Sequence, residues 1–117
     1  MQKNYPKLGK LAKQPDIRAV ARARRRCQAG SFVVNWRTRE DGQTASRLCV
    51  VIRKKSIPSA VRRNRMKRLV REFFRQNQNQ FAKKADFLVH VNRFESIQYK
   101  DIAEILTKAL AKAGVLQ

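Results

Sequence analysis

The sequence predicts one α+β domain, a sandwich of helices against a small β-sheet. With 117 residues the chain has the length of a single ordinary domain. Its apolar fraction of 43% is typical of a folded protein rather than of a disordered basic tail. Helical and extended patterns follow one another in the order α-β-β-α-β-α, without an internal repeat or a low-complexity linker, and this mixture is typical of α+β folds.

The N-terminal part is predicted to be an arm followed by a short helix. Residues 1–13 are basic and contain glycine, and we expect them to form a flexible arm. Pro15 begins the helix, since proline is favoured in a first helical turn. The helix is amphipathic because Ile17, Val20 and Ala21 share one side at helical spacing, while most of its arginines fall elsewhere.

Two extended segments follow, at 31–37 and 47–52, and both are rich in β-branched and aromatic residues. The intervening residues 40–43, Glu-Asp-Gly-Gln, are typical of a turn. We therefore predict that the two strands form a β-hairpin. A short extra strand near residues 53–55 is an open alternative.

The second half of the chain is predicted to contain two helices on either side of a strand. The first helix runs to about residue 76, with Ser59 as its N-cap. The strand covers 86–91, a continuous apolar run that indicates burial on both faces. The last helix covers about 96–113, and Gly114 is placed to end it as a C-cap.

The helix that begins after Ser59 has one apolar and one basic side. Successive residues are rotated by about 100° around a helix axis. The apolar stripe contains Met66, Leu69, Val70 and Phe73, and the opposite face contains Asn64, Lys67, Arg68, Arg71 and Arg75. The amphipathic pattern predicts that the helix packs on the sheet with its cations outward.

The charge of the chain indicates a polyanionic partner. Lys and Arg number 28 against 8 acidic residues, a formal net charge of +20. Ten of these cations lie between Arg53 and Arg75, where no carboxylate precedes Glu72. Such crowding is destabilising unless an anion neutralises it, and the arginine fork suits phosphate. The pattern predicts a phosphate-binding surface.

RNA is the favoured polyanion. The segment before Ser59 reads as a strand, which argues against a helix-turn-helix and hence against DNA. RNA is recognised through shape, phosphates and unstacked bases, which a basic helix beside a sheet can contact. The predicted RNA-binding residues are Arg53, Lys54, Lys55, Arg62, Arg63, Asn64, Arg65, Lys67, Arg68, Arg71 and Arg75.

The sequence offers little for catalysis, metal binding or a membrane. The acidic residues are scattered, so we expect no catalytic residue in the protein. Cys27 and Cys49 lack metal-ligand spacing, and we expect no metal site and no disulfide. His90 lies in an apolar strand and is interpreted as a semi-buried structural histidine. Without a membrane span or a signal peptide, we expect a cytoplasmic protein.

The basic helix resembles the signature helix of the bacterial ribonuclease P protein subunit. Residues 63–72 read R-N-R-M-K-R-L-V-R-E and contain every position of the family pattern R-N-x-x-K-R-x-x-R-E. The resemblance continues at 47–55, which is similar to an R-L-G strand that runs into basic residues, and at 11–34 and 86–91. It covers nearly the whole chain.

This resemblance implies an α-β-β-β-α-β-α domain like the second domain of ribosomal protein S5. Its β-α-β crossover would be left-handed, an exception to the usual rule. It further implies an accessory subunit of an endoribonuclease whose RNA is the catalyst, using Mg²⁺ held mainly by that RNA to remove the 5′ leader of precursor tRNA. The protein would be a monomer bound to one catalytic RNA. Its signature helix would contact that RNA through Arg63, Asn64, Lys67, Arg68 and Arg71, while Glu72 would orient a neighbouring arginine.

The resemblance also implies a leader cleft between the first helix and the sheet, at Ile17, Ala21, Val33 and Asn35. The family usually has aromatic residues at the positions of Ile17 and Ala21, and often at Asn35. Because these positions are aliphatic or polar here, we expect stacking on bases, about 1–3 kcal/mol per base, to be largely lost. Alternation places Phe32 and Trp36 on the opposite face of the strand, where core packing is their expected role.

Two other classes of function remain open from the sequence. A structural protein of the ribosome would have a similar composition, and its expected partner is an intact ribosomal subunit. An autonomous nuclease would cut RNA in the absence of any RNA subunit.

Overall fold

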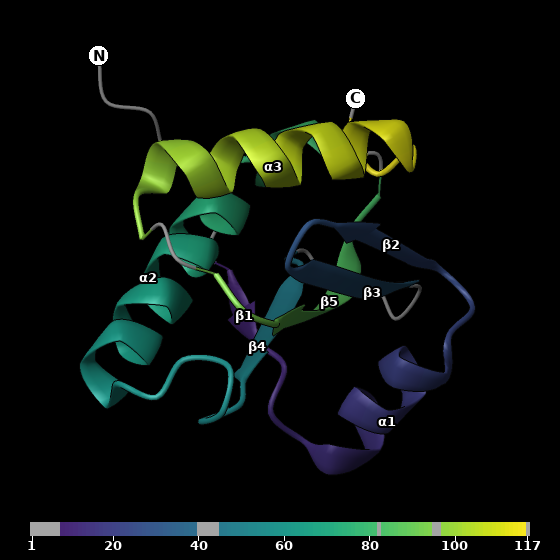
Figure 1. Cartoon of the computed structure of the whole chain (residues 1–117). Coiled ribbons are helices and arrows are strands. Elements are labelled where there is room, and N and C mark those ends of the chain that lie inside the picture. Colours follow the sequence, from purple (N-terminus) through teal and green to yellow (C-terminus); the bar gives the residue numbers. More distant parts are fainter. Residues whose placement is uncertain (1–7, 40–44, 82, 95–96, 117) are drawn as a thin grey trace.

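The computed structural model describes residues 8–39, 45–81, 83–94 and 97–116. In these residues a five-stranded mixed sheet packs against three α-helices and a short 3-10 helix (Figure 1). The elements in chain order are β1 (Gly9–Lys10), α1 (Gln14–Arg22), β2 (Arg26–Ala29), β3 (Phe32–Thr38), β4 (Arg47–Ile52), α2 (Ala60–Gln76), η1 (Gln78–Gln80), β5 (Ala85–Val91) and α3 (Tyr99–Lys112).

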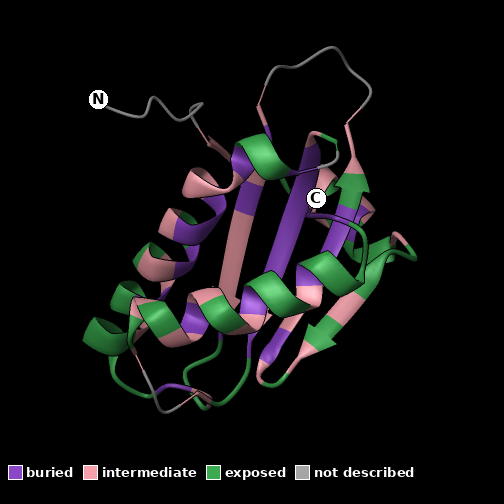
Figure 2. Ribbon diagram, turned by 90° about the horizontal axis from the view of Figure 1, so that it is seen from above, coloured by how far each residue is buried: buried purple, intermediate pink, exposed green. Residues whose placement is uncertain are grey.

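The strand order across the sheet is β1-β4-β5-β3-β2, so the most apolar strand, β5, lies in the middle. β5 is parallel to β4 and antiparallel to β3. The connection from β4 through α2 to β5 is thus a parallel β-α-β unit, as expected from the family resemblance. Helices α2 and α3 cover one face of the sheet, and α1 lies on the other face (Figures 1 and 2).

The main core lies between the sheet and the helices α2 and α3. Alternation along β3 directs Phe32, Val34 and Trp36 into it, which confirms the packing role predicted for the two aromatic rings. Phe74 and Phe87 pack with their ring centroids 4.9 Å apart. A smaller cluster of Leu11, Val20 and Leu88 lies beneath α1 on the opposite face. The central strand therefore contributes side chains to both clusters, and its predicted burial on both faces is confirmed.

The helix predicted after Ser59 is confirmed as α2. The Ser59 side chain accepts a hydrogen bond from the backbone N–H of Arg62 at 3.3 Å, as an N-cap does. Met66, Val70 and Phe73 are buried as the apolar stripe predicted. The predicted C-cap of the last helix is also present, since Gly114 has a φ of 80° just after α3, a conformation that favours glycine.

The predicted hairpin between residues 31–37 and 47–52 is wrong. β3 and β4 are not neighbours, because β5 lies between them and pairs with both. The true hairpin joins β2 to β3 and turns at Gly30, whose φ is 55°. Turn-forming residues predict a change of direction but not which strand becomes the neighbour. The predicted turn itself, 40–43, lies outside the described residues.

Two further expectations are corrected at the sheet edges. Residues 53–55 form a turn and no strand, since the carbonyl of Arg53 accepts hydrogen bonds from the N–H groups of Ser56 and Ile57. The predicted arm 1–13 is ordered at its end, because Gly9 donates to the carbonyl of Ser46 at 2.8 Å and Leu11 is only 1% exposed. Residues 1–7 lie outside the described part. The additional strands are therefore β1 and β2.

Candidate RNA interface

The outer face of α2 is a row of exposed cations. Arg68 and Arg71 are exposed and Lys67 is half-buried, in agreement with their predicted outward position. None of these three forms an ion pair with a carboxylate among the described residues. Asn64, Arg62 and Arg65 are exposed on the same helix. Lys67, Arg68 and Arg71 can therefore donate hydrogen bonds to phosphate oxygens without first breaking a salt bridge to a described carboxylate.

Two arginines predicted to bind RNA have structural partners at the start of α2. Arg63 donates hydrogen bonds to the carbonyls of Ile57 and Pro58, both at 2.8 Å. It therefore fastens the turn that precedes the helix. Arg65 donates to the carbonyl of Ile97 at 3.3 Å and links α2 to the segment before α3.

Glu72 holds an arginine near the end of α2, as the family resemblance implied. The Arg75 guanidinium donates to Glu72 through its Nε at 3.0 Å. This hydrogen bond is the main cause that lowers the pKa of Glu72, with a further contribution from the Gln76 amide. The carboxylate stays ionised and fixes the direction of Arg75, which is less free to reach RNA than the rest of the row.

A basic pocket joins α2 to the edge of the sheet. Its volume is about 220 Å³, and its wall includes Lys10, Lys67, Arg71 and Cys49. Burial raises the pKa of the Cys49 thiol, and the three cations act in the opposite direction. Lys10 was not among the predicted RNA-binding residues. The only sequence signal for it was membership of the basic N-terminal segment, which does not reveal pairing of β1 with β4.

The residues Arg53, Lys54 and Lys55 are all exposed in the turn between β4 and α2. They are close in sequence both to the N-terminus of α2 and to the end of β4. Arg53 also lines a groove on the α1 side of the sheet. The turn therefore connects the basic face of the helix with that groove.

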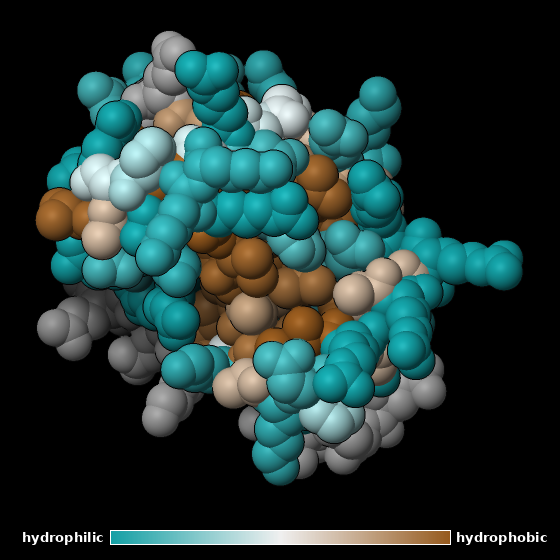
Figure 3. Space-filling view, turned by 60° about the horizontal axis from the view of Figure 1, so that its bottom comes forward, coloured by the Kyte–Doolittle hydropathy of each residue, from teal (hydrophilic) through white to brown (hydrophobic). Residues whose placement is uncertain are grey.

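The groove has a volume of about 340 Å³ and lies beside α1 on the open face of the sheet. Figure 3 shows a hollow with a hydrophobic floor and a hydrophilic rim on the side of the molecule where α1 lies. Three of the four predicted cleft residues line it, namely Ala21, Val33 and Asn35. Ile17 does not line it and instead packs against the small cluster beneath α1.

Sequence reasoning missed several residues that line the same groove, above all Arg26, His90 and Asn92. Register explains the position of His90, which pairs with Val33 on one side and with Val51 on the other. Burial lowers the pKa of His90, and the charges of Arg53 and Arg26 lower it further. Alternation in the strand could have placed His90 on the α1 face, but it could not have shown that Arg26 of β2 and Arg53 of the turn after β4 line the same groove.

A buried carboxylate holds the scaffold of the groove together. The side chain of Asp86 is 1% exposed, and both of its oxygens accept hydrogen bonds of 2.7 Å from Arg47. Arg37 and Arg39 lie at 3.5 and 3.8 Å from the same carboxylate. Arg47 also reaches Asp16 of α1 at 3.4 Å. These ion pairs connect β3, β4 and β5 to α1, so the acidic residues serve here as charge partners.

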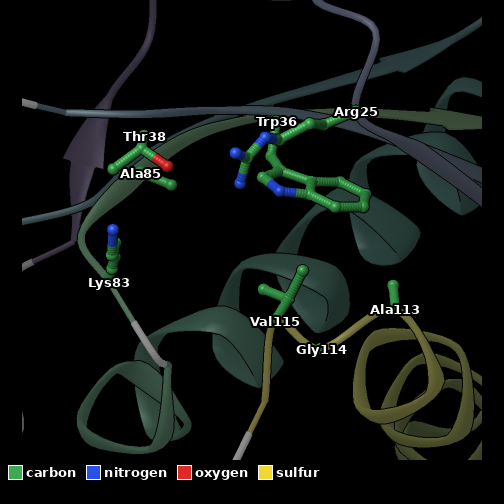
Figure 4. Close-up of a pocket in the computed structure, with 8 residues that line it drawn as sticks. All are labelled: Arg25, Trp36, Thr38, Lys83, Ala85, Ala113, Gly114 and Val115. Atoms are coloured by element: carbon green, nitrogen blue, oxygen red, sulfur yellow. The ribbon is translucent and has the colours of Figure 1, made fainter.

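A further hollow lies between β3 and the end of α3 and has a volume of about 180 Å³. Figure 4 shows Trp36 and Arg25 on one side of it and Val115 on the facing side. Lys83 also lines the hollow and contributes a second cation. Because the Trp36 side chain is largely buried, this hollow is better explained as the edge of the core than as a stacking platform.

The described residues offer neither a metal site nor a membrane span. Within these ranges no cluster of three or more His, Cys, Asp or Glu side chains could hold a metal ion. Cys27 and Cys49 are both free thiols. None of the described helices is long and apolar enough to cross a membrane.

The comparison with known proteins decides the family. The family model described as Ribonuclease P matches residues 5–114, almost the entire chain. The chain belongs to the ribonuclease P protein family. A relative named ribonuclease P protein component, from Dictyoglomus thermophilum, is 33% identical over 118 residues, covering 97% of this chain and 95% of its own length.

Solved structures of ribonuclease P proteins have the same fold. The protein from Thermotoga maritima superposes with a TM-score of 0.73 at 31% identity, covering 85% of this chain and 94% of its own. The protein from Staphylococcus aureus superposes with a TM-score of 0.71 at 23% identity, covering 98% of this chain and 100% of its own, and supports the fold alone. These matches identify a protein component of the tRNA-processing ribonuclease P and favour this reading over a ribosomal protein.

Proposed function

We propose that the chain binds the catalytic RNA of ribonuclease P through α2 and holds the 5′ leader of precursor tRNA in the groove beside α1. The observation that carries the proposal is the row of Lys67, Arg68 and Arg71, which has no carboxylate partner among the described residues. Arginine and lysine in such a row complement the negative charge of an RNA backbone.

The groove supports the leader part of the proposal. It combines an apolar floor at Val33 and Val51 with the cations Arg26 and Arg53 and the amide of Asn35. An apolar floor suits an unstacked base, and flanking cations suit the phosphates on either side of it. A double-stranded stem does not fit a hollow of this size, so the groove favours single-stranded RNA.

In this proposal the RNA subunit performs catalysis with Mg²⁺ that is held mainly by RNA. The protein contributes positive charge and positions the leader. It acts as a monomer with one catalytic RNA, in the cytoplasm, where tRNA precursors are processed. The described side chains supply no carboxylate cluster for an independent metal-dependent hydrolysis.

Reconstitution tests the proposal. The protein is combined with the catalytic RNA of its own organism, and cleavage of precursor tRNA is followed at low Mg²⁺ concentration. The protein alone should be inert, the RNA alone slow, and the two together fast. Cleavage by the protein without added RNA, or no acceleration by the protein, would contradict the proposal.

The contribution of α2 is tested by the double variant Arg68→Ala/Arg71→Ala. Each lost phosphate contact should reduce the slope of log affinity against log salt by about 0.7–0.9, or about 1.5 for two. The matched control is Lys108→Ala, which removes a cation that already pairs with Glu104 on the exposed face of α3. An unchanged slope in the double variant would show that these arginines face solvent in the complex.

A further inference from the structure

The only histidine of the chain lies on the floor of the groove. His90 is on the central strand β5, between Val33 of β3 and Val51 of β4, and it is half-buried. Among the described residues, no hydrogen bond to its imidazole is found. A half-buried ring in such a position has an unused donor and an unused acceptor that open toward the groove.

The charged groups around this ring are all cationic. The groove lining contributes Arg26 from β2 and Arg53 from the turn that follows β4. The other elements against it contribute no titratable group, since α1 supplies Ala21 and β3 supplies Val33 and Asn35. The imidazole therefore shares the groove with two guanidinium groups, and no carboxylate lines it.

We propose that His90, flanked by Arg26 and Arg53, is the residue of this groove that recognises a nucleotide of the leader. The inference rests on the proposed function of the groove. The two arginines bind the phosphate, the valine floor receives the apolar part of the nucleotide, and the imidazole contacts the base. Histidine is one of the side chains on which unstacked bases pack, so it replaces a planar contact that Ile17 and Ala21 cannot provide.

The surroundings of His90 make this contact sensitive to pH. Burial and the two arginines lower the pKa of the free imidazole, so the ring is neutral near pH 7. A phosphate bound between the arginines offsets their charge and raises the pKa of His90. The complex then binds more protons than the free protein does, so affinity for the leader rises as pH falls, by at most tenfold per pH unit for one proton.

The test compares precursor tRNA with mature tRNA on the reconstituted holoenzyme. The ratio of the two affinities is measured between about pH 6 and pH 8. In the unchanged protein the ratio should rise as pH falls. In His90→Gln, which keeps a polar side chain but removes the ring and its charge, the ratio should fall about tenfold at the acidic end and lose its pH dependence.

A second measurement does not depend on the variant. Because His90 is the only histidine, its imidazole signals can be followed by NMR in the full chain without ambiguity. Titration with a short single-stranded RNA of leader sequence should shift these signals and raise the pKa of His90. Unchanged signals at saturation would overturn the inference.

Failure of the inference differs from failure of the proposed function. If the holoenzyme does not distinguish precursor from mature tRNA at any pH, the leader groove itself is refuted. If it distinguishes them and His90→Gln does so equally well with the same pH profile, only the assignment of His90 is wrong. Circular dichroism of the variant establishes that the fold is retained in either case.

Discussion

The substitution Asp86→Asn should reduce the free energy of unfolding by about 3 kcal/mol. The carboxylate is 1% exposed and accepts two hydrogen bonds of 2.7 Å from Arg47. Arg37 and Arg39 lie within 3.8 Å of it. Asparagine keeps the shape of the side chain but removes the negative charge that contacts all three arginines.

The magnitude follows from burial. Breaking a buried ion pair by removing one partner costs about 3–5 kcal/mol, because the other charge is left without compensation. The lower end applies here, since the side chain of Arg37 is 44% exposed and that of Arg47 is 23% exposed. Water and the second partner of Arg47, Asp16, therefore relieve part of the loss.

Urea denaturation measures the effect. With an m-value of about 1.5 kcal/mol per molar, the midpoint should fall by about 2 M. The matched control is Glu104→Gln, which also removes one negative charge but breaks only an exposed pair with Lys108. Pairs of that kind contribute about 0.3–0.5 kcal/mol. Equal shifts in the two variants would refute the argument that the buried carboxylate organises the sheet.

A double variant separates charge from shape. Removing Arg47 as well, as in Asp86→Asn/Arg47→Met, takes away the cation that the first substitution leaves buried. The double variant should lose less free energy of unfolding than the sum of the losses in the two single variants, because the two residues are directly coupled. Simple additivity would show that the cost of Asp86→Asn does not come from the stranded charge.

Three smaller predictions follow from local geometry. Ser59→Ala removes the N-cap of α2 and should cost about 1 kcal/mol in urea denaturation, with no cost from Ser59→Asp. Gly114→Ala places a Cβ at a φ of 80° and should cost about 1 kcal/mol by the same assay; a neutral result would show that the chain after α3 relaxes. Ala21→Phe adds a ring at the groove, and binding to precursor tRNA should tighten several-fold while binding to mature tRNA stays unchanged; equal tightening of both would argue against a leader site.

The helices were predictable because their signals are local. The outward position of Arg68 and Arg71 follows from the rotation per residue, and the start of α2 follows from Ser59. Strand pairing depends on residues far apart in the sequence. The mistaken hairpin between 31–37 and 47–52 arose because each segment reads as a strand. The pairing of both strands with β5 depends on how the core packs, and a local pattern does not contain that information.

The groove was less predictable than the helix surface for the same reason. Its lining comes from five elements and from residues just after β4 and β5, and the sequence assigned to the cleft only residues of α1 and β3. Alternation can place His90 on one face of a strand, but the neighbours of that face are set by the sheet order. The resemblance to a known family directed attention to a cleft at α1 and β3, and it gave no information about His90.

Three alternate side chains on the α1 face of β5 connect the stability of the sheet with the proposed leader groove. Asp86 binds Arg47, which ties α1 to the sheet through Asp16; Leu88 packs beneath α1, and His90 lines the groove. A substitution of Asp86 should therefore change the position of α1 and, with it, the shape of the groove. The basic row of α2 lies on the opposite side of the sheet and depends on Met66 and the other core contacts of that helix. Loss of Asp86 should for this reason weaken leader binding before it weakens docking to the catalytic RNA.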